Sequence, residues 1–206
     1  MKWHSITWLI CAALLPVTAA AQEKLQYTID APKSKLELNV YREGAFKFLG
    51  HDHLVAAQGV SGTVQLDPAS IERSSVSLKV ETKSLRVLDP KVSEKERREV
   101  QDTMEGEKVL DAARYPEITF TSTSVSEVKP TGSGYELTLT GELRLHGVVK
   151  TIRLPVRVRL EGRELRVHGE TPLRQTEYQM TPVRVAGGTV KVKDQLKLSF
   201  EIVALK

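Results

Sequence analysis

The sharpest chemical signal in the chain is the stretch His51-Asp52-His53. In extended backbone, residues two apart point the same way, so both imidazoles can reach one metal ion. His146 or His168 would have to supply a further ligand. The alternative is that this polar loop caps one end of the fold, where the histidines bond backbone carbonyls or a ligand head group. Two histidines without an established third ligand favour the second interpretation, and we predict no metal site.

A catalytic role for the same residues would need a nucleophile or an activated water molecule beside a base. The chain contains Ser61, Ser84 and Ser122, but none of them lies in a Gly-x-Ser-x-Gly elbow. His51 and Asp52 do not form a relay, because adjacent residues of a strand point to opposite faces. We therefore predict a protein that is not an enzyme, with no catalytic residues.

A row of basic side chains is the third candidate feature. It comprises Arg144, Lys150, Arg153, Arg157, Arg159, Arg163 and Arg166. Such a row could dock peripherally onto an anionic membrane surface. A solvated strand face, kept soluble by charge, is the favoured interpretation. The formal net charge of the whole chain is only +4, with acids interleaved among the bases, so nucleic-acid binding is excluded.

The element that must position these residues is the stretch 135–161. Apolar residues occupy every second position from Tyr135 to Leu145, and the alternation resumes in the opposite phase from Ile152 to Leu160. This pattern predicts two long strands, each with one apolar and one polar face, that turn at His146-Gly147. Long strands with one dry face are typical of a barrel that encloses an apolar volume.

The remaining sequence adds further short strands and one helix. Ser93-Glu94-Lys95-Glu96 is a capping box, and Gly106 ends the helix that it begins. We expect Val100, Met104 and Leu110 to hold this charged helix over a barrel mouth or edge. The last strand is predicted to run unbroken from Val190 to Ile202, with a bulge at Asp194. The fold class is therefore all-β, an antiparallel up-and-down barrel of about eight strands with one short helix.

The N-terminus predicts export. Residues 1–21 combine Lys2, an apolar run and the small residues Ala19 and Ala21, which is the pattern of a cleavable signal peptide. The expected mature domain, residues 22–206, contains no cysteine and is destined for the periplasm. Its stability must then come from burial rather than from disulfides.

Four segments carry a resemblance to a known family. They are Tyr27-Thr28-Ile29-Asp30, Gly50-His51-Asp52-His53, Tyr115-Pro116-Glu117-Ile118-Thr119-Phe120-Thr121-Ser122 and Thr140-Gly141-Glu142-Leu143-Arg144-Leu145-His146-Gly147. Through them the chain resembles the YceI-like, polyisoprenoid-binding family of bacterial periplasmic proteins. The resemblance covers the whole mature domain. It implies an extended lipocalin-like barrel that holds a long isoprenoid or similar amphiphile, with no cofactor.

The expected function is therefore to enclose an isoprenoid, quinone or fatty amphiphile for transport, storage or sequestration. The ligand-binding candidates are Phe46, Phe48, His51, His53, Arg86, Tyr115, Phe120, Tyr178 and Phe200. A barrel packed by its own side chains, acting as a stress or interaction protein, stays open as an alternative. So does a metal-binding periplasmic protein that uses His51 and His53. A homodimer could form through the irregular segment Thr171 to Gly188.

Overall fold

The computed structural model of the chain describes residues 23–44 and 51–206, apart from the side chains of residues 185 and 186. The predicted signal peptide and the ligand-binding candidates Phe46 and Phe48 lie outside the described residues. Within them, no helix has the length and apolar character needed to cross a membrane.

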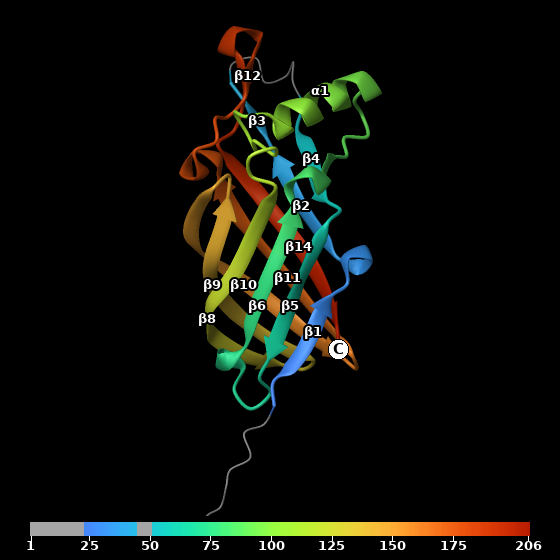
Figure 1. Cartoon of the computed structure of the whole chain (residues 1–206), viewed down its shortest axis with the longest axis vertical. Helices are drawn as coiled ribbons and strands as arrows, with labels where there is room; N and C mark the ends of the chain where they lie inside the picture. Colours follow the sequence, from blue (N-terminus) through green and yellow to red (C-terminus); the bar gives the residue numbers. More distant parts are fainter. Residues whose placement is uncertain (1–22, 45–50) are drawn as a thin grey trace, which may run out of the picture.

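Eight antiparallel strands form a closed ring, as predicted (Figure 1). The ring closes because the last strand pairs back with the first, through Thr28 opposite Leu205 and Ile29 opposite Ala204. In spatial order the strands are β1 (Leu25–Ile29), β5 (Val60–Leu66), β6 (Ser75–Glu81), β8 (Glu117–Thr131), β9 (Gly134–Leu145), β10 (Val148–Glu161), β11 (Glu164–Arg174) and β14 (Gln195–Leu205). Closure leaves the ring itself without a free edge.

Three further strands extend the wall on one side. They are β2 (Lys35–Val40), β4 (His53–Ala57) and β7 (Leu85–Val87), and they follow β14 in the order β14, β2, β4, β7. Short irregular segments separate each from a ring strand. One is the 3-10 helix Ala31–Lys33, where Asp30 accepts a hydrogen bond from the backbone N–H of Lys33. β7 is the last strand of this sheet in the described chain.

The central hairpin confirms the prediction from residues 135–161. β9 and β10 pair without a register shift, from Leu145 opposite Val148 to Gly134 opposite Arg159. The turn residues His146 and Gly147 both have positive φ, 50° and 76°, which suits a two-residue hairpin turn. Gly147 must be glycine for a second reason, because a Cβ there would lie 2.5 Å from the Tyr115 ring.

The predicted unbroken last strand is wrong. The structure divides it into β13 (Val190–Val192) and β14, with Lys193 and Asp194 between them. Asp194 is not a bulge within a strand, because its carboxylate accepts hydrogen bonds from the backbone N–H and the hydroxyl of Thr176. β13 instead joins β12 (Arg184–Val185) and β3 (Arg42–Glu43) in a small second sheet.

The helix α1 (Glu94–Glu105) begins at the predicted capping box. Ser93 accepts from the N–H of Glu96, and the Glu96 carboxylate accepts from the N–H of Ser93. None of its residues is fully buried, but Val100 and Met104 pack against the core. Figure 1 shows α1, β12 and β3 at the upper end of the barrel and the C-terminus at the lower end.

Candidate ligand-binding cavity

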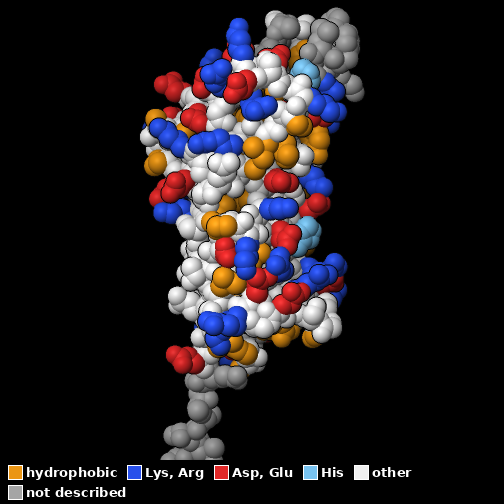
Figure 2. Space-filling view, turned by 90° about the vertical axis from the view of Figure 1, so that its right-hand side faces the viewer, with side chains coloured by type: hydrophobic (Ala, Val, Ile, Leu, Met, Phe, Trp, Pro, Cys, Tyr) orange, Lys and Arg blue, Asp and Glu red, His pale blue; other side chains and the backbone are white. Residues whose placement is uncertain are grey.

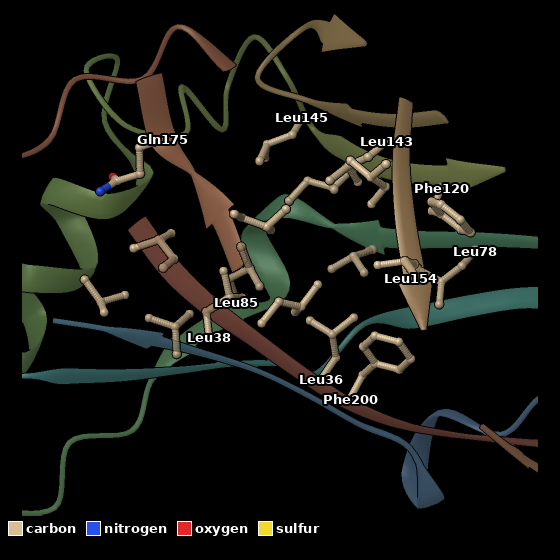
Figure 3. Close-up of a pocket in the computed structure, with 18 of the residues that line it drawn as sticks. Leu36, Leu38, Leu78, Leu85, Phe120, Leu143, Leu145, Leu154, Gln175 and Phe200 are labelled. Carbon is tan, nitrogen blue, oxygen red and sulfur yellow. The ribbon is translucent and has the colours of Figure 1, made fainter. Parts of the chain in front are cut away.

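A cavity of about 580 Å³ occupies the interior of the barrel (Figure 3). Alternation along each strand turns one set of side chains inward, and these inward positions are leucine and valine almost throughout. The volume falls within the roughly 300–1,000 Å³ of small-molecule sites. The leucines of its wall include Leu36, Leu38, Leu78, Leu85, Leu139, Leu143, Leu145, Leu154 and Leu198. The interior is therefore not filled by side chains, which weakens the packed-barrel alternative.

Two aromatic rings lie against glycines on the cavity wall. A Cβ at Gly141 would lie 2.5 Å from Cζ of Phe120, and a Cβ at Gly169 would lie 2.6 Å from Cζ of Phe200. Because glycine has no side chain, each of these positions leaves room at the wall for the neighbouring phenylalanine ring. Because the rings use this space at the wall, they leave more of the interior free. Phe120 and Phe200, both predicted as ligand-binding residues, line the cavity.

The cationic side chains that line the cavity each have a carboxylate nearby. Lys191 pairs with Glu43 at 2.8 Å, measured from Nζ to Oε1. Arg42 lies 3.6 Å from Asp52, and Arg174 lies 3.8 Å from Asp194. Two carboxylates of α1, Glu96 and Glu99, also line the cavity. These three cations are therefore offset by nearby carboxylates, and the two glutamates of α1 add negative charge.

Both histidines of the candidate metal stretch line the cavity. His53 Nδ1 lies 2.5 Å from the buried carboxylate of Asp89, whose other oxygen accepts the backbone N–H of Leu54 at 2.8 Å. The expected third ligands are engaged elsewhere or point outward. His146 donates from Nδ1 to the Tyr178 carbonyl, and His168 is exposed on β11. Among the described residues, no three His, Cys, Asp or Glu side chains are grouped to hold a metal ion.

One buried polar side chain lines the cavity. Gln175, 4% exposed, belongs to the irregular segment after β11 and was not singled out from the sequence. Its Nε2 donates to the carbonyl of Lys193 at 2.9 Å. Nothing in its sequence context distinguishes it from an exposed loop glutamine, because its burial depends on the distant residues 193 and 194.

A family model, the YceI-like domain, matches residues 27–204. The chain belongs to the YceI-like family. The match spans almost all of the described barrel, including the cavity wall and both of its glycine–phenylalanine contacts.

Solved structures of other proteins share the fold. The crystal structure of Burkholderia cenocepacia BcnA is 23% identical, covers 85% of this chain and 98% of its own, and has a TM-score of 0.66. The Campylobacter jejuni YceI protein is 17% identical, covers 74% of this chain and 84% of its own, and has a TM-score of 0.57. None of the curated proteins compared with the chain matches it.

Three of the predicted ligand-binding residues lie off the cavity wall of this YceI-like barrel. Arg86 is exposed and donates to the carbonyls of Lys83 and Leu85. Tyr115 contacts the ring of His146 edge-on, with ring centroids 4.9 Å apart. Tyr178 is 1% exposed, and its hydroxyl has no hydrogen-bond partner among residues 23–44 and 51–206. Burial, followed by the charge of Glu177, raises the pKa of Tyr178 to about 12. A role of these three in ligand binding stays a prediction.

The free edge of β7 is closed by a side chain rather than by a strand. The Gln101 amide of α1 donates from Nε2 to the Leu85 carbonyl at 2.8 Å and accepts the N–H of Val87 at 3.0 Å. These are the bonds that a neighbouring strand would have made. Gln101 thus joins α1 to the edge of β7 in the wall of the cavity, and we call this junction between β7 and α1 the seam.

Three of the seven residues of the basic row on the outer face are paired with acids. Arg157 bonds Glu136 at 2.6 Å, and Arg153 bonds Glu127 at 3.0 Å. Arg166 pairs with Glu164 and Glu201. Figure 2 views the right-hand side of Figure 1, a different face from that of β9 and β10, and there too basic and acidic side chains are interleaved. This pairing fits the solvated-face interpretation, and docking onto an anionic membrane stays a prediction.

Proposed function

We propose that this YceI-like protein is a periplasmic binding protein that encloses the apolar tail of an isoprenoid-type or fatty amphiphile. The main support for this proposal is the cavity of about 580 Å³, whose wall consists mainly of leucine and valine. An apolar cavity of this size stays dry and takes an apolar guest. The guest is carried, stored or sequestered, and no covalent step is involved.

Burial of the tail supplies the free energy of binding. Each CH₂ group moved from water to an apolar wall contributes about 0.8 kcal/mol, so a dozen carbons gain roughly 10 kcal/mol. Loss of translational freedom and ordering of the chain oppose binding by about 4–15 kcal/mol. We therefore expect micromolar affinity only for tails longer than about a dozen carbons.

The distribution of polarity along the cavity supports an amphiphile rather than a hydrocarbon. The interior is leucine and valine, while Arg42, His51 and Glu96 are among the polar residues of the wall. The tail therefore enters the barrel and the polar head stays near these groups. The predicted signal peptide supports the periplasm as the site of action. The homodimer expected through residues 171–188 stays a prediction, since Leu173, Tyr178 and Met180 of that segment are already buried within one chain.

Native mass spectrometry of the mature protein, purified from a bacterial periplasm, tests the proposal. We expect an excess mass that disappears on solvent extraction, with an isoprenoid or fatty amphiphile in the extract. A bare mass that stays unchanged after incubation with both kinds of amphiphile would overturn the proposal.

A pair of tryptophan variants tests the location of the guest. Leu139→Trp places an indole in the cavity, and Glu142→Trp places one on the exposed outer face of the same strand. Trp3 and Trp8, the only tryptophans, lie in the predicted signal peptide, so each variant carries a single fluorophore after cleavage. We expect Leu139→Trp to lose the bound lipid and Glu142→Trp to retain it. Equal retention by both variants would contradict an internal site.

A further inference from the structure

The cavity wall contains one polar side chain with unused hydrogen-bonding capacity at a buried position. Among the buried polar residues of the described chain, Gln175 is the one that lines the cavity. Lys193 offers a carbonyl, which can only accept, so the Gln175 nitrogen must face it. Among the described residues, Oε1 then has no hydrogen-bond partner, and one N–H of Nε2 has none either.

Backbone hydrogen bonds on both sides fix the position of Gln175 in the chain. Its backbone N–H donates to the Asp194 carbonyl at 3.0 Å, and its own carbonyl accepts from Met180 at 3.2 Å. The next residue, Thr176, bonds both carboxylate oxygens of Asp194. Figure 3 shows Gln175 at the opposite end of the cavity from Phe120 and Phe200. The free amide atoms are therefore preorganised at one end of the leucine- and valine-lined cavity.

The charged groups around the cavity do not form a site for an anionic head. Arg42, Arg174 and Lys191 each have a carboxylate within 4 Å. Glu96 also lines the cavity, and the hydrogen bond from the backbone N–H of Ser93 lowers its pKa, so this group is ionised at neutral pH. A phosphate or carboxylate head would meet paired cations and a like charge, at a cost in desolvation.

We propose that Gln175 selects an uncharged head group that both donates and accepts a hydrogen bond, such as a primary alcohol or a carboxamide. The head donates to Oε1 of Gln175 and accepts its free N–H, while the tail fills the leucine-lined interior. A quinone carbonyl or an ether satisfies only the N–H and leaves Oε1 unpaired. This inference rests on the proposed function, because it names the head of the amphiphile that the cavity encloses.

Three probes with one common tail test the inference on the wild-type protein: geranylgeraniol, its methyl ether and its monophosphate. We expect the alcohol to bind about tenfold more tightly than the ether, from the hydrogen bond to Oε1. The monophosphate is expected to bind more weakly than the ether. Equal affinity for alcohol and ether, or tightest binding of the monophosphate, would overturn the inference alone. Absence of binding by all three would overturn the proposed function as well.

A substitution assigns the preference to this side chain. In Gln175→Leu, the alcohol should fall to the affinity of the ether, while the affinity for the ether changes by less than about twofold. Retained ether binding shows that the variant is folded. Gln195→Leu, at an exposed glutamine on β14, is the matched control and should keep the tenfold preference. A preference for the alcohol that persists in Gln175→Leu would overturn the role of Gln175.

Discussion

Substitution of Gln101 by alanine should open the seam beside β7 without unfolding the barrel. Gln101 makes the two hydrogen bonds that close the β7 edge, to the carbonyl of Leu85 and from the N–H of Val87. Apart from these, α1 is held mainly by Val100 and Met104, and it has no buried residue. Loss of one side chain therefore removes much of what fixes the helix to the wall.

The size of the effect follows from the number of bonds lost. Each hydrogen bond contributes about 0.5–1.5 kcal/mol net, so two contribute about 1–3 kcal/mol to closure of the seam. This range corresponds to a roughly 5- to 150-fold increase in the population with the seam open. The free energy of global unfolding should change by less, because none of the eight ring strands includes Gln101, Leu85 or Val87.

Hydrogen exchange of the Val87 amide measures the opening directly, since Val87 donates to Gln101 Oε1. We expect the exchange of this amide to accelerate in Gln101→Ala by the factor given above. The amide of Val156, which lies in the centre of β10, should exchange as in the wild type. Asp102→Ala, at the adjacent exposed residue of α1, is the matched control and should leave both amides unchanged.

Two results would refute this reasoning. Unchanged exchange at Val87 would mean that the Gln101 amide does not close the edge. Acceleration of Val87 and Val156 by the same factor would mean that the substitution lowers global stability and that the seam has no independent opening.

Three further predictions concern the wall, a buried hydroxyl and an outer ion pair. Gly169→Ala puts a Cβ 2.6 Å from Cζ of the Phe200 ring and should lower the free energy of unfolding in urea by about 1–3 kcal/mol. It should also reduce the amount of lipid bound per protein, because the ring must move into the cavity. Unchanged values of both quantities would contradict the contact. Burial raises the pKa of Tyr178 from 10.0 to about 12, so the free energy of unfolding should fall as the pH rises from 10 toward 12. Tyr178→Phe should reduce this fall, measured as urea midpoints across the pH range. An identical fall in the variant would contradict the role of the buried hydroxyl. The hydrogen bond from Arg157 lowers the pKa of Glu136 below 4.5, so the stability that this pair contributes above pH 4.5 is lost as the pH falls. Glu136→Gln should therefore weaken the dependence of the urea midpoint on acidic pH. An unchanged pH dependence would contradict a contribution of the pair.

The sequence predicts best where local pattern and tertiary contact agree. The alternation in residues 135–161 specifies which side chains face inward, so the hairpin, its turn and the inner leucines follow from it. Phe120 and Phe200 belong to regular strands, and their register turns them into the cavity. Tyr115 and Tyr178 lie outside the strands, where no period relates a residue to a direction. Their position off the cavity wall therefore could not be read from the pattern.

Side chains that replace backbone bonds are the features that the sequence does not reveal. The sequence predicts Gln101 as a polar residue on a charged helix, but its side chain completes the hydrogen bonding of β7. Asp194 reads as a bulge, yet it binds Thr176, eighteen positions earlier. Gln175 reads as part of an irregular loop, yet it is buried on the cavity wall. Each role depends on a segment that is distant in sequence, and local propensity contains no information about it.

These features together predict where the proposed amphiphile would enter the barrel. On one side the wall consists of long strands, β8 to β11, whose ladders would have to break to admit a tail. On the other side the three-residue strand β7 is closed by one glutamine and covered by a helix without buried residues. Local opening follows the path that breaks the fewest buried contacts. We therefore expect the tail to exchange through the seam beneath α1, so that Gln101→Ala speeds both loading and release of a fluorescent amphiphile while its affinity changes less than its rates.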